Sequence, residues 1–437
     1  MTESDARAWE NEHAEDGCPA GALARRSFLH GSVVASLGVT AHASVVGGEA
    51  TRTYPPPSDN TRTLAVPFHG YHQAGIAIPP PNQRQPTATF ASFDVTATNR
   101  TELNQLFRTL TARARFLTEG GPVPNVPRGS PPLDNGILGF TVVPDALTVT
   151  VAVGATLFDS RYGLGERKPV QLVTMKPFRH DDLEPALSQG DLLIQLCAGH
   201  RDTTIHALLD IMTHTKRVMK PRWSIDGIRS PSRPVGVSRD WFGFKDGIAN
   251  PTTTNTAQMN QVVWVQPHTD EPAWTAGGTY QVLRIIRFDV LKWQQVPLDQ
   301  QERIFGRRKD SGAPLYAREA NDSDLLDPIY TNDPHGLITP LDSHIRLANP
   351  QSPQTAATSA ILRRSYEYAR TPETPGVLDV GHAFCCYQRE LRTYIAMQTR
   401  LEAERLVPYV SPRGGGYFFA LPGVRNKRDY YARGLLT

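Results

Sequence analysis

The sequence predicts an α+β fold of two similar halves, in which antiparallel sheets form a β-rich core flanked by helices. The first half alternates strand, helix, strand, strand, helix and strand, which is the order of a ferredoxin-like unit. The second half repeats these kinds of segment without a detectable sequence repeat. The 36 prolines and 34 glycines among 437 residues predict many turns and few long helices.

In the first half, strands are expected where apolar and polar side chains alternate: 88–96, 147–153 and 191–198. Helices are expected at 101–117 and 203–216. The first helix places one apolar face toward a core, and Thr101 is its expected N-cap. That face consists of Leu103, Leu106, Phe107, Leu110 and Ala114.

In the second half, the alternating run at 279–288 predicts a long strand, and two short helices are expected at 289–293 and 298–305. A strand at 382–387, a helix at 389–406 and a last strand at 416–420 follow. We therefore expect two ferredoxin-like domains, an N-terminal one at 67–240 and a C-terminal one at 241–437.

Charge and cysteine content narrow the function classes. The formal net charge is +3, from 46 basic and 43 acidic side chains, so no basic surface for nucleic acid is indicated. The four cysteines are Cys18, Cys197, Cys385 and Cys386. Without a CxxC pair or regular spacing they suit neither a disulfide framework nor a zinc ribbon, and buried thiols are the expected state.

The N-terminus has the pattern of an export signal. Residues 24–30 read ARRSFLH, a weakly apolar run follows at 31–40, and 41–43 read AHA. A twin arginine, a short apolar stretch and an A-x-A site are typical of a Tat leader, expected at 1–43 with a flexible lead-in at 44–66. The alternative is a chance Arg-Arg before a buried helix. The run is too short to span a bilayer, so no integral membrane segment is expected.

The segment at 239–251, RDWFGFKDGIANP, is the most distinctive in the chain. Gly243 and Gly247 bracket Asp246 in a turn, where glycine lets the backbone approach a ligand closely. An isolated Asp-Gly pair is usually a plain turn, so this segment needs support from elsewhere in the sequence.

The same segment resembles the GxxDG signature of the dye-decolorising peroxidase family. Further motifs of that family follow in the same order: GYHQAGI at 70–76, GDL at 190–192 leading to IHA at 205–207, SHIRLANP at 343–350, ILRR at 361–364 and RGGGYFFALPG at 413–423. The resemblance extends from about residue 63 to 434. It is nearest to the exported, Tat-dependent branch, which includes proteins described as deferrochelatases.

The resemblance implies one non-covalent haem b per chain, held in the second ferredoxin-like domain. It implies that His344 is the proximal iron ligand, Asp246 the distal acid–base and Arg363 the distal electrostatic partner. Such roles are chemically consistent, because an arginine keeps its charge and favours both an anionic carboxylate and the charge on a departing oxygen. Gly247, beside Asp246, is expected in the haem site.

Further assignments follow for the second half. A proximal histidine needs an acceptor on its other ring nitrogen, and Asp379 is the candidate, with a capping or turn carboxylate as the alternative. Arg346 is a candidate for the haem carboxylates, with a surface salt bridge as the alternative. The family oxidises bulky donors at surface aromatic residues, for which the candidates are Tyr366, Tyr368, Tyr387, Trp274 and Trp293.

Three functions are open at this point. The main one is a haem peroxidase that reduces hydrogen peroxide and oxidises dyes or phenolics, exported to the periplasm or beyond. The alternative is a haem-handling protein of the deferrochelatase kind, acting in iron acquisition. Asp246 and Arg363 favour the peroxidase, since haem binding alone needs neither. The third function, an exported binding protein without redox chemistry, requires that the His344 match is accidental. Partners expected besides peroxide and organic reductants are the Tat machinery and a second copy of the chain.

Overall fold

The computed structural model describes residues 63–79, 85–233, 236–317, 324–352, 354–356, 358–372 and 376–437. The predicted leader at 1–43 lies outside these ranges, as does the lead-in up to residue 62. All described elements belong to one compact unit.

The described part of the main sheet is formed by nine strands. They are β1 (Thr87–Val95), β4 (Thr148–Gly154), β5 (Leu192–Ala198), β6 (Met219–Ile228), β7 (Thr279–Phe288), β8 (Leu362–Arg363), β9 (Tyr366–Arg370), β10 (Asp379–Gln388) and β11 (Val410–Ala420). A separate small hairpin is formed by β2 (Gly121–Pro122) and β3 (Thr141–Val142).

The strand order contains two ferredoxin-like sheets. In the first half the order is β4-β5-β1-β6, and in the second half β9-β10-β7-β11, so both repeat the same connectivity. The sheets join where β11 pairs with β4 and where β6 meets β9 at Ile228 and Glu367. Because β7 also pairs with β10, the strands form a closed ring. The predicted α+β class is confirmed; the division near residue 240 stays a prediction.

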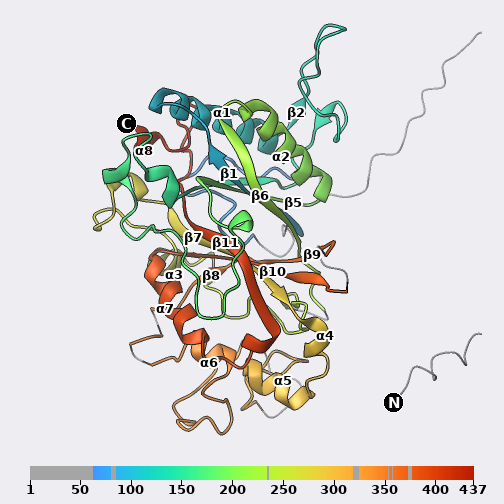
Figure 1. Cartoon of the computed structure of the whole chain (residues 1–437), viewed down its shortest axis with the longest axis vertical. Coiled ribbons are helices and arrows are strands. Elements are labelled where there is room, and N and C mark those ends of the chain that lie inside the picture. Colours follow the sequence, from blue (N-terminus) through green and yellow to red (C-terminus); the bar gives the residue numbers. More distant parts are fainter. Residues whose placement is uncertain are drawn as a thin grey trace, which may run out of the picture. The chain divides into compact units, whose positions relative to one another are not determined.

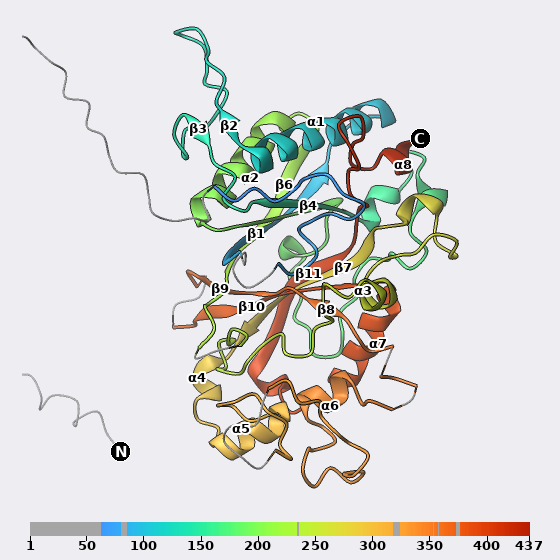
Figure 2. The same ribbon diagram turned by 180° about the vertical axis from the view of Figure 1, so that it is seen from behind.

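Helices surround this ring, and one of them, α3 (Thr256–Val262), packs Met259 and Val262 into the apolar cluster inside it. They are α1 (Arg100–Glu119), α2 (Arg201–Thr215), α3 (Thr256–Val262), α4 (Val290–Trp293), α5 (Leu298–Phe305), α6 (His344–Ala348), α7 (Leu391–Leu401) and α8 (Arg433–Leu436). Short 3₁₀ turns are η2 (Ala155–Phe158), η3 (Gly165–Arg167), η4 (Pro185–Leu187), η5 (Ala273–Thr275) and η6 (Val407–Tyr409). Figures 1 and 2 show α1 and α2 side by side at one end, and α4 to α7 grouped at the other.

The predicted elements are found with shifted ends. The N-cap of α1 is Asn99, whose side chain accepts the amide hydrogen of Glu102, and not Thr101, which lies inside the helix. The helix expected at 389–406 ends at Leu401, because the chain turns into η6 before β11. The strands expected at 382–387 and 416–420 are the inner parts of longer strands, β10 and β11.

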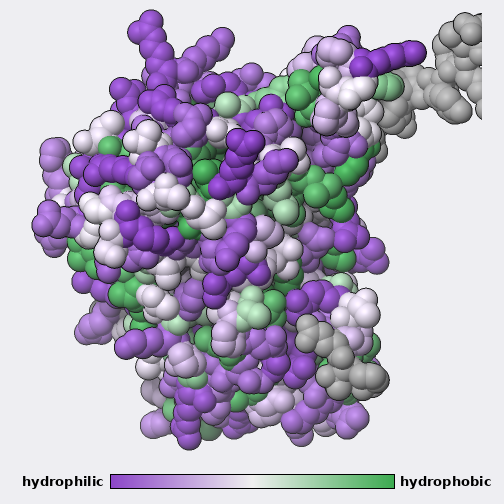
Figure 3. All heavy atoms as spheres, turned by 45° about the horizontal axis from the view of Figure 1, so that its top comes forward, coloured by the Kyte–Doolittle hydropathy of each residue, from purple (hydrophilic) through white to green (hydrophobic). Residues whose placement is uncertain are grey.

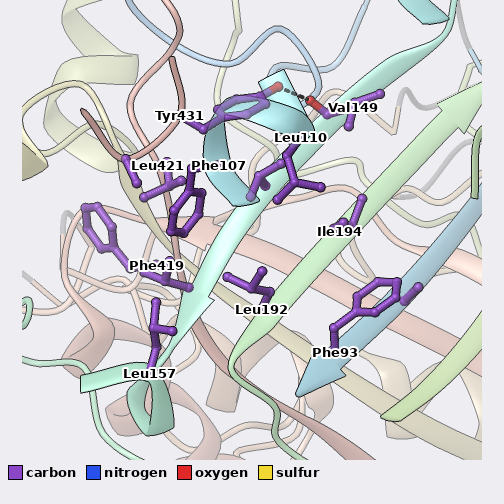
Figure 4. Close-up of a cluster of buried hydrophobic side chains, with 14 of the residues drawn as sticks. Phe93, Phe107, Leu110, Val149, Leu157, Leu192, Ile194, Phe419, Leu421 and Tyr431 are labelled. Carbon is purple, nitrogen blue, oxygen red and sulfur yellow. Dashed lines mark hydrogen bonds between the residues drawn. The ribbon is translucent and has the colours of Figure 1, made fainter. Parts of the chain in front are cut away.

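A continuous apolar core lies between the helices and the sheet of the first half. Phe107 and Leu110 of α1 are buried against β4 and β5, and Phe419 joins them from β11 (Figure 4). The Tyr431 hydroxyl, at the C-terminal end of the chain, donates a hydrogen bond of 3.0 Å to the carbonyl oxygen of Val149. Each fully buried Leu or Phe side chain contributes about 1.5–3 kcal/mol, so this core fixes the two halves against each other.

The face in Figure 3 is mostly hydrophilic, with apolar residues in small separated patches. Over the ranges that the structure describes, no helix is long and apolar enough to cross a bilayer.

Candidate active site

The site begins with the alternation of side chains across β8, β9 and β10. β8 and β9 lie along β10 in one continuous register, with Arg363 opposite Cys386 and Glu367 opposite His382. Because successive side chains point to opposite faces of a sheet, Arg363, Glu367 and His382 share one face. On that face His382 packs near Phe288 of β7, so it is the outer face, toward the helices of the second half.

A loop that follows β6 places a carboxylate over this face. Gly243 and Gly247 adopt φ angles of 86° and 91°, a region that favours glycine, and between them the amide of Asp246 donates to the Ser238 carbonyl at 2.9 Å. The Asn250 side chain binds both backbone groups of Arg363, at 2.8 and 2.9 Å. The loop and β8 are thereby fixed to each other as one unit.

Asp246 and Arg363 form an ion pair at the centre of the site. The Arg363 Nη1 atom donates to Asp246 Oδ1 at 3.0 Å, and 24% of the Arg363 and 16% of the Asp246 side-chain surface is accessible. Burial alone raises the pKa of Asp246, but the charge of Arg363, aided by His382 and Arg229, outweighs it and the pKa is lowered. The carboxylate is therefore charged even at acid pH.

His344 is the first residue of α6 and is held from behind by Glu404. Its Nδ1 lies 2.6 Å from Glu404 Oε2, and no residue that the structure describes binds its Nε2. Burial lowers the pKa of His344, but the charge and hydrogen bond of Glu404 outweigh this and the pKa is raised. The carboxylate thus holds the hydrogen on Nδ1 and directs Nε2 away from Glu404 as a metal ligand would be directed.

The surroundings of His344 leave room for a ligand. The His344 side chain is half-buried, with 30% of its surface accessible, so open space adjoins it. The charge of Arg363 lowers the pKa of His344 and that of Asp240 raises it, so both charged groups act on the ring. A free imidazole nitrogen and a paired carboxylate and guanidinium beside open space fit an iron porphyrin with one axial histidine.

Two sequence assignments are corrected. Asp379 lies at the start of β10, where it accepts the Tyr368 hydroxyl at 3.0 Å and pairs with Arg370 at 2.7 Å. The acceptor for His344 is instead Glu404, which folding brings back from the segment between α7 and η6.

Arg346 does not face the site. Its guanidinium donates to the carbonyls of Thr339 and Asp333, each at 2.8 Å, and lies over the Tyr330 ring. It therefore holds the loop before α6 and has its donors engaged there. Gly247 directly follows Asp246 in the loop, and a side chain at this position would be strained at its φ of 91°.

The predicted surface aromatic residues are mostly interior. Tyr366, Tyr368 and Tyr387 point into the ring of strands and are buried, as is Trp293. Only Trp274 is partly exposed, and its indole nitrogen donates to the Arg167 carbonyl. A route for electrons to large donors therefore cannot start at the first four.

Sequence reasoning missed Glu404, Asn250 and His382. Glu404 lies in a polar run without a distinctive motif, and only the fold brings it to His344. Asn250 was within the recognised segment, but its partner is the backbone of a distant strand. His382 had one available signal, namely a histidine within a strand that is otherwise apolar. Among the described residues, no group of three or more His, Cys, Asp or Glu could hold a bare metal ion.

Comparison with known proteins identifies the family of this chain. Residues 73–229 match the model of the Dyp-type peroxidase N-terminal domain, and residues 237–425 match that of the C-terminal domain. The chain belongs to the DyP-type peroxidase family. It is therefore a DyP-type peroxidase family enzyme, with the alpha+beta fold of that family.

The deferrochelatase of Escherichia coli strain K12 is 43% identical over 419 residues, covering 94% of this chain and 96% of that protein. The DyP-type peroxidase of Cellulomonas bogoriensis has a TM-score of 0.74 at 30% identity, covering 86% of this chain and 99% of its own. Ferric DtpA of Streptomyces lividans has a TM-score of 0.75 at 28% identity, covering 87% and 99%. A protein of the same fold, DypB of Rhodococcus jostii, was solved in complex with heme. Structural neighbours of this DyP-type enzyme are thus haem-bound peroxidases.

Proposed function

We propose that this DyP-type enzyme binds one haem b without covalent attachment, with His344 Nε2 as the axial ligand to iron. Three observations support this: the free Nε2, the accessible surface of the half-buried ring, and the Glu404 carboxylate behind Nδ1. When bound, the haem supplies an iron centre that binds peroxide and exchanges electrons.

The protein's own residues provide the proton and charge chemistry for peroxide reduction. Asp246 accepts a proton from one oxygen of the peroxide and returns it to the other oxygen, which departs as water. Arg363 stabilises the charge that develops on the departing oxygen and keeps Asp246 anionic. The 3.0 Å Asp246–Arg363 pair with accessible side chains is the observation that carries the peroxidase function. Organic donors such as dyes or phenolics supply the electrons.

The relatives favour a second function for the same site. Proteins that align with 94% of this chain at 43% identity carry the name deferrochelatase. We infer that this enzyme also handles haem as a source of iron, so that haem is a substrate as well as a cofactor. Iron acquisition then defines its cellular role, and peroxide reduction is the chemistry that the Asp246–Arg363 pair supports.

Purified holoprotein separates these functions. Mixed with peroxide and an organic donor, it should oxidise the donor while its haem stays intact; mixed with haem and a reductant, it should release metal-free porphyrin, measured by chromatography and fluorescence. His344→Ala should lack a Soret band. Asp246→Asn should keep the band but react with peroxide about 100-fold more slowly or worse.

Asp342→Asn is the matched control. Asp342 is close in sequence to His344, but it is exposed and pairs with Arg405. It should behave as the unmodified enzyme. A holoprotein that neither oxidises donors nor releases iron would refute both functions. Normal haem content in His344→Ala would refute His344 as the ligand of the haem iron.

We further propose that the chain is exported folded by the Tat pathway, with haem already bound. The twin arginine at Arg25 and Arg26 supports this proposal. Replacing both by lysine should leave the protein in the cytoplasmic fraction while its haem content stays normal. Equal amounts in the exported fraction would refute the pathway.

A further inference from the structure

A second histidine faces the Asp246 carboxylate from the sheet. His382 lies on β10 with 9% of its side chain exposed, and its Nε2 is 3.9 Å from Asp246 Oδ2. Its ring lies parallel to that of Phe288, with centroids 6.0 Å apart, and Phe384 flanks it at 6.3 Å. The aromatic rings fix the plane of the imidazole, and Nε2 faces the carboxylate oxygen that Arg363 does not bind.

Neither ring nitrogen of His382 makes a hydrogen bond with a described residue. Its Nδ1 is buried without a partner, and Nε2 is beyond hydrogen-bond distance of Asp246. His206, which is also buried, has an unpartnered Nδ1 too but differs in its Nε2, which lies 2.7 Å from Asp134. Leaving a buried polar atom without a partner costs about 1–3 kcal/mol, so a histidine retained in this state needs a reason beyond packing.

The residue opposite His382 is in the same condition. Glu367 of β9 is the direct cross-strand partner of His382, and its Oε2 is likewise buried without a partner. Directly opposed residues of an antiparallel pair have adjacent side chains on one face. Two unsatisfied polar side chains therefore lie next to each other, and one of them faces Asp246.

The charges around His382 define the protonation states of this row. Asp246 faces it from the loop, Arg363 from β8 and Arg229 from the end of β6, while β7 contributes Ile286 and Phe288. Burial lowers the pKa of His382 to about 4, against the opposing effect of Asp246.

Burial and the charge of Asp246 raise the pKa of Glu367 to about 8. Near neutral pH, Glu367 therefore holds a proton, His382 is neutral and Asp246 is anionic. Glu367 as proton donor, the neutral imidazole of His382 and Asp246 as proton acceptor are thus neighbours in space.

We propose that His382 is a positioning residue that carries protons between Glu367 and Asp246. The inference rests on the proposed function, because both candidate reactions consume protons at this site. Reducing hydrogen peroxide to two waters takes two protons and two electrons from the donor, and releasing iron from a porphyrin puts two protons on its nitrogens.

The transfer balances within the row. A proton moves from the Glu367 carboxyl to His382 Nδ1, and the proton on Nε2 leaves to Asp246 Oδ2. The imidazole is neutral before and after but now carries its hydrogen on Nδ1; exchange with a water returns the hydrogen to Nε2, and Glu367 regains a proton from solvent. A small rotation or one water closes the 3.9 Å gap, as expected for a site whose hydrogen bonds tighten when loaded.

The first test measures the electrostatic interaction between His382 and Asp246 and does not depend on activity. Holoprotein with ¹³C-labelled histidine, in its diamagnetic ferrous carbon monoxide form, is titrated by NMR, and the His382 signal is identified by its loss in His382→Phe. The midpoint should lie near pH 4 and should fall by about 1 unit or more in Asp246→Asn, because the carboxylate that favours the imidazolium is gone. An unchanged midpoint would overturn the contact with Asp246.

The second test measures proton delivery. His382→Phe keeps an aromatic ring between Phe288 and Phe384 but cannot carry a proton, and steady-state turnover should fall about 10- to 100-fold. Turnover of the unmodified enzyme should decline as pH rises through about 8, where Glu367 loses its proton. Glu367→Gln should show the low turnover without this decline, and it is the independent variant should His382→Phe not fold.

Phe384→Leu is the matched control, because it alters packing against the same ring and removes no titratable group. It should keep full turnover and the decline near pH 8. Full turnover in both His382→Phe and Glu367→Gln would overturn the relay while leaving the proposed function intact. Absence of both reactions in the unmodified holoprotein would instead refute the proposed function, and the NMR titration would still report on His382.

Discussion

Replacing Glu404 by glutamine removes one charge behind the proposed iron ligand and almost nothing else. The Glu404 carboxylate lies 2.6 Å from His344 Nδ1 and is 8% exposed, so the hydrogen bond is charge-assisted and shielded from water. Hydrogen bonds to charged groups contribute about 1.5–3 kcal/mol, and loss of a partner of a metal-binding histidine weakens metal binding about 10- to 100-fold. Glutamine keeps the shape of the side chain and one acceptor oxygen, so we expect haem binding to weaken by about 10- to 100-fold.

The assay is transfer of haem from the holoprotein to an excess of apomyoglobin, followed by the Soret band. Glu404→Gln should release haem about 10- to 100-fold faster than the unmodified protein. Glu402→Gln is the control, since it makes the same change two residues away, where the carboxylate accepts the Arg179 amide and not His344. Equal release rates in all three proteins would refute the role of Glu404 as the orienting acceptor.

Three further outcomes follow from the structure. Arg363→Leu removes the main charge that lowers the pKa of Asp246. In stopped flow, the pH below which the reaction with peroxide slows should therefore rise by about 1–3 units. An unchanged value would contradict the pairing of Asp246 with Arg363. The pKa of Glu367 is raised from 4.5 to about 8, so the free energy of unfolding falls as pH rises between these values. In urea titrations, Glu367→Gln should therefore be more stable than the unmodified protein at pH 8, by up to about 4 kcal/mol, but not at pH 4. Equal stability of the two proteins at both pH values would contradict a buried, protonated Glu367. Burial raises the pKa of the Cys385 thiol to about 12 and that of Cys386 well above its usual value, so neither should react with a thiol reagent until denaturant is added; rapid labelling of the native protein would contradict their burial.

The periodicity of the chain was enough to predict the α+β class and most elements. Alternating apolar side chains at 279–288 and the apolar stripe of α1 depend on local geometry alone, so a sequence shows them directly. The ends of elements were less certain, as at Asn99, because caps depend on a few local hydrogen bonds. The closure of the strands into a ring depends on pairing between β7 and β10 and between β11 and β4, which no local pattern encodes.

What the sequence by itself determined was a set of motifs in order, and through them His344, Asp246 and Arg363 as candidates for one site. What only the tertiary structure decided was which side chains support them: Glu404 and not Asp379 behind His344, and His382 beside Asp246. The physical reason is that a hydrogen-bond partner is selected by distance and direction in space, while chain separation carries little information about either. His344 and Glu404 lie 60 positions apart and meet only because α6 and α7 pack together at the same end of the sheet.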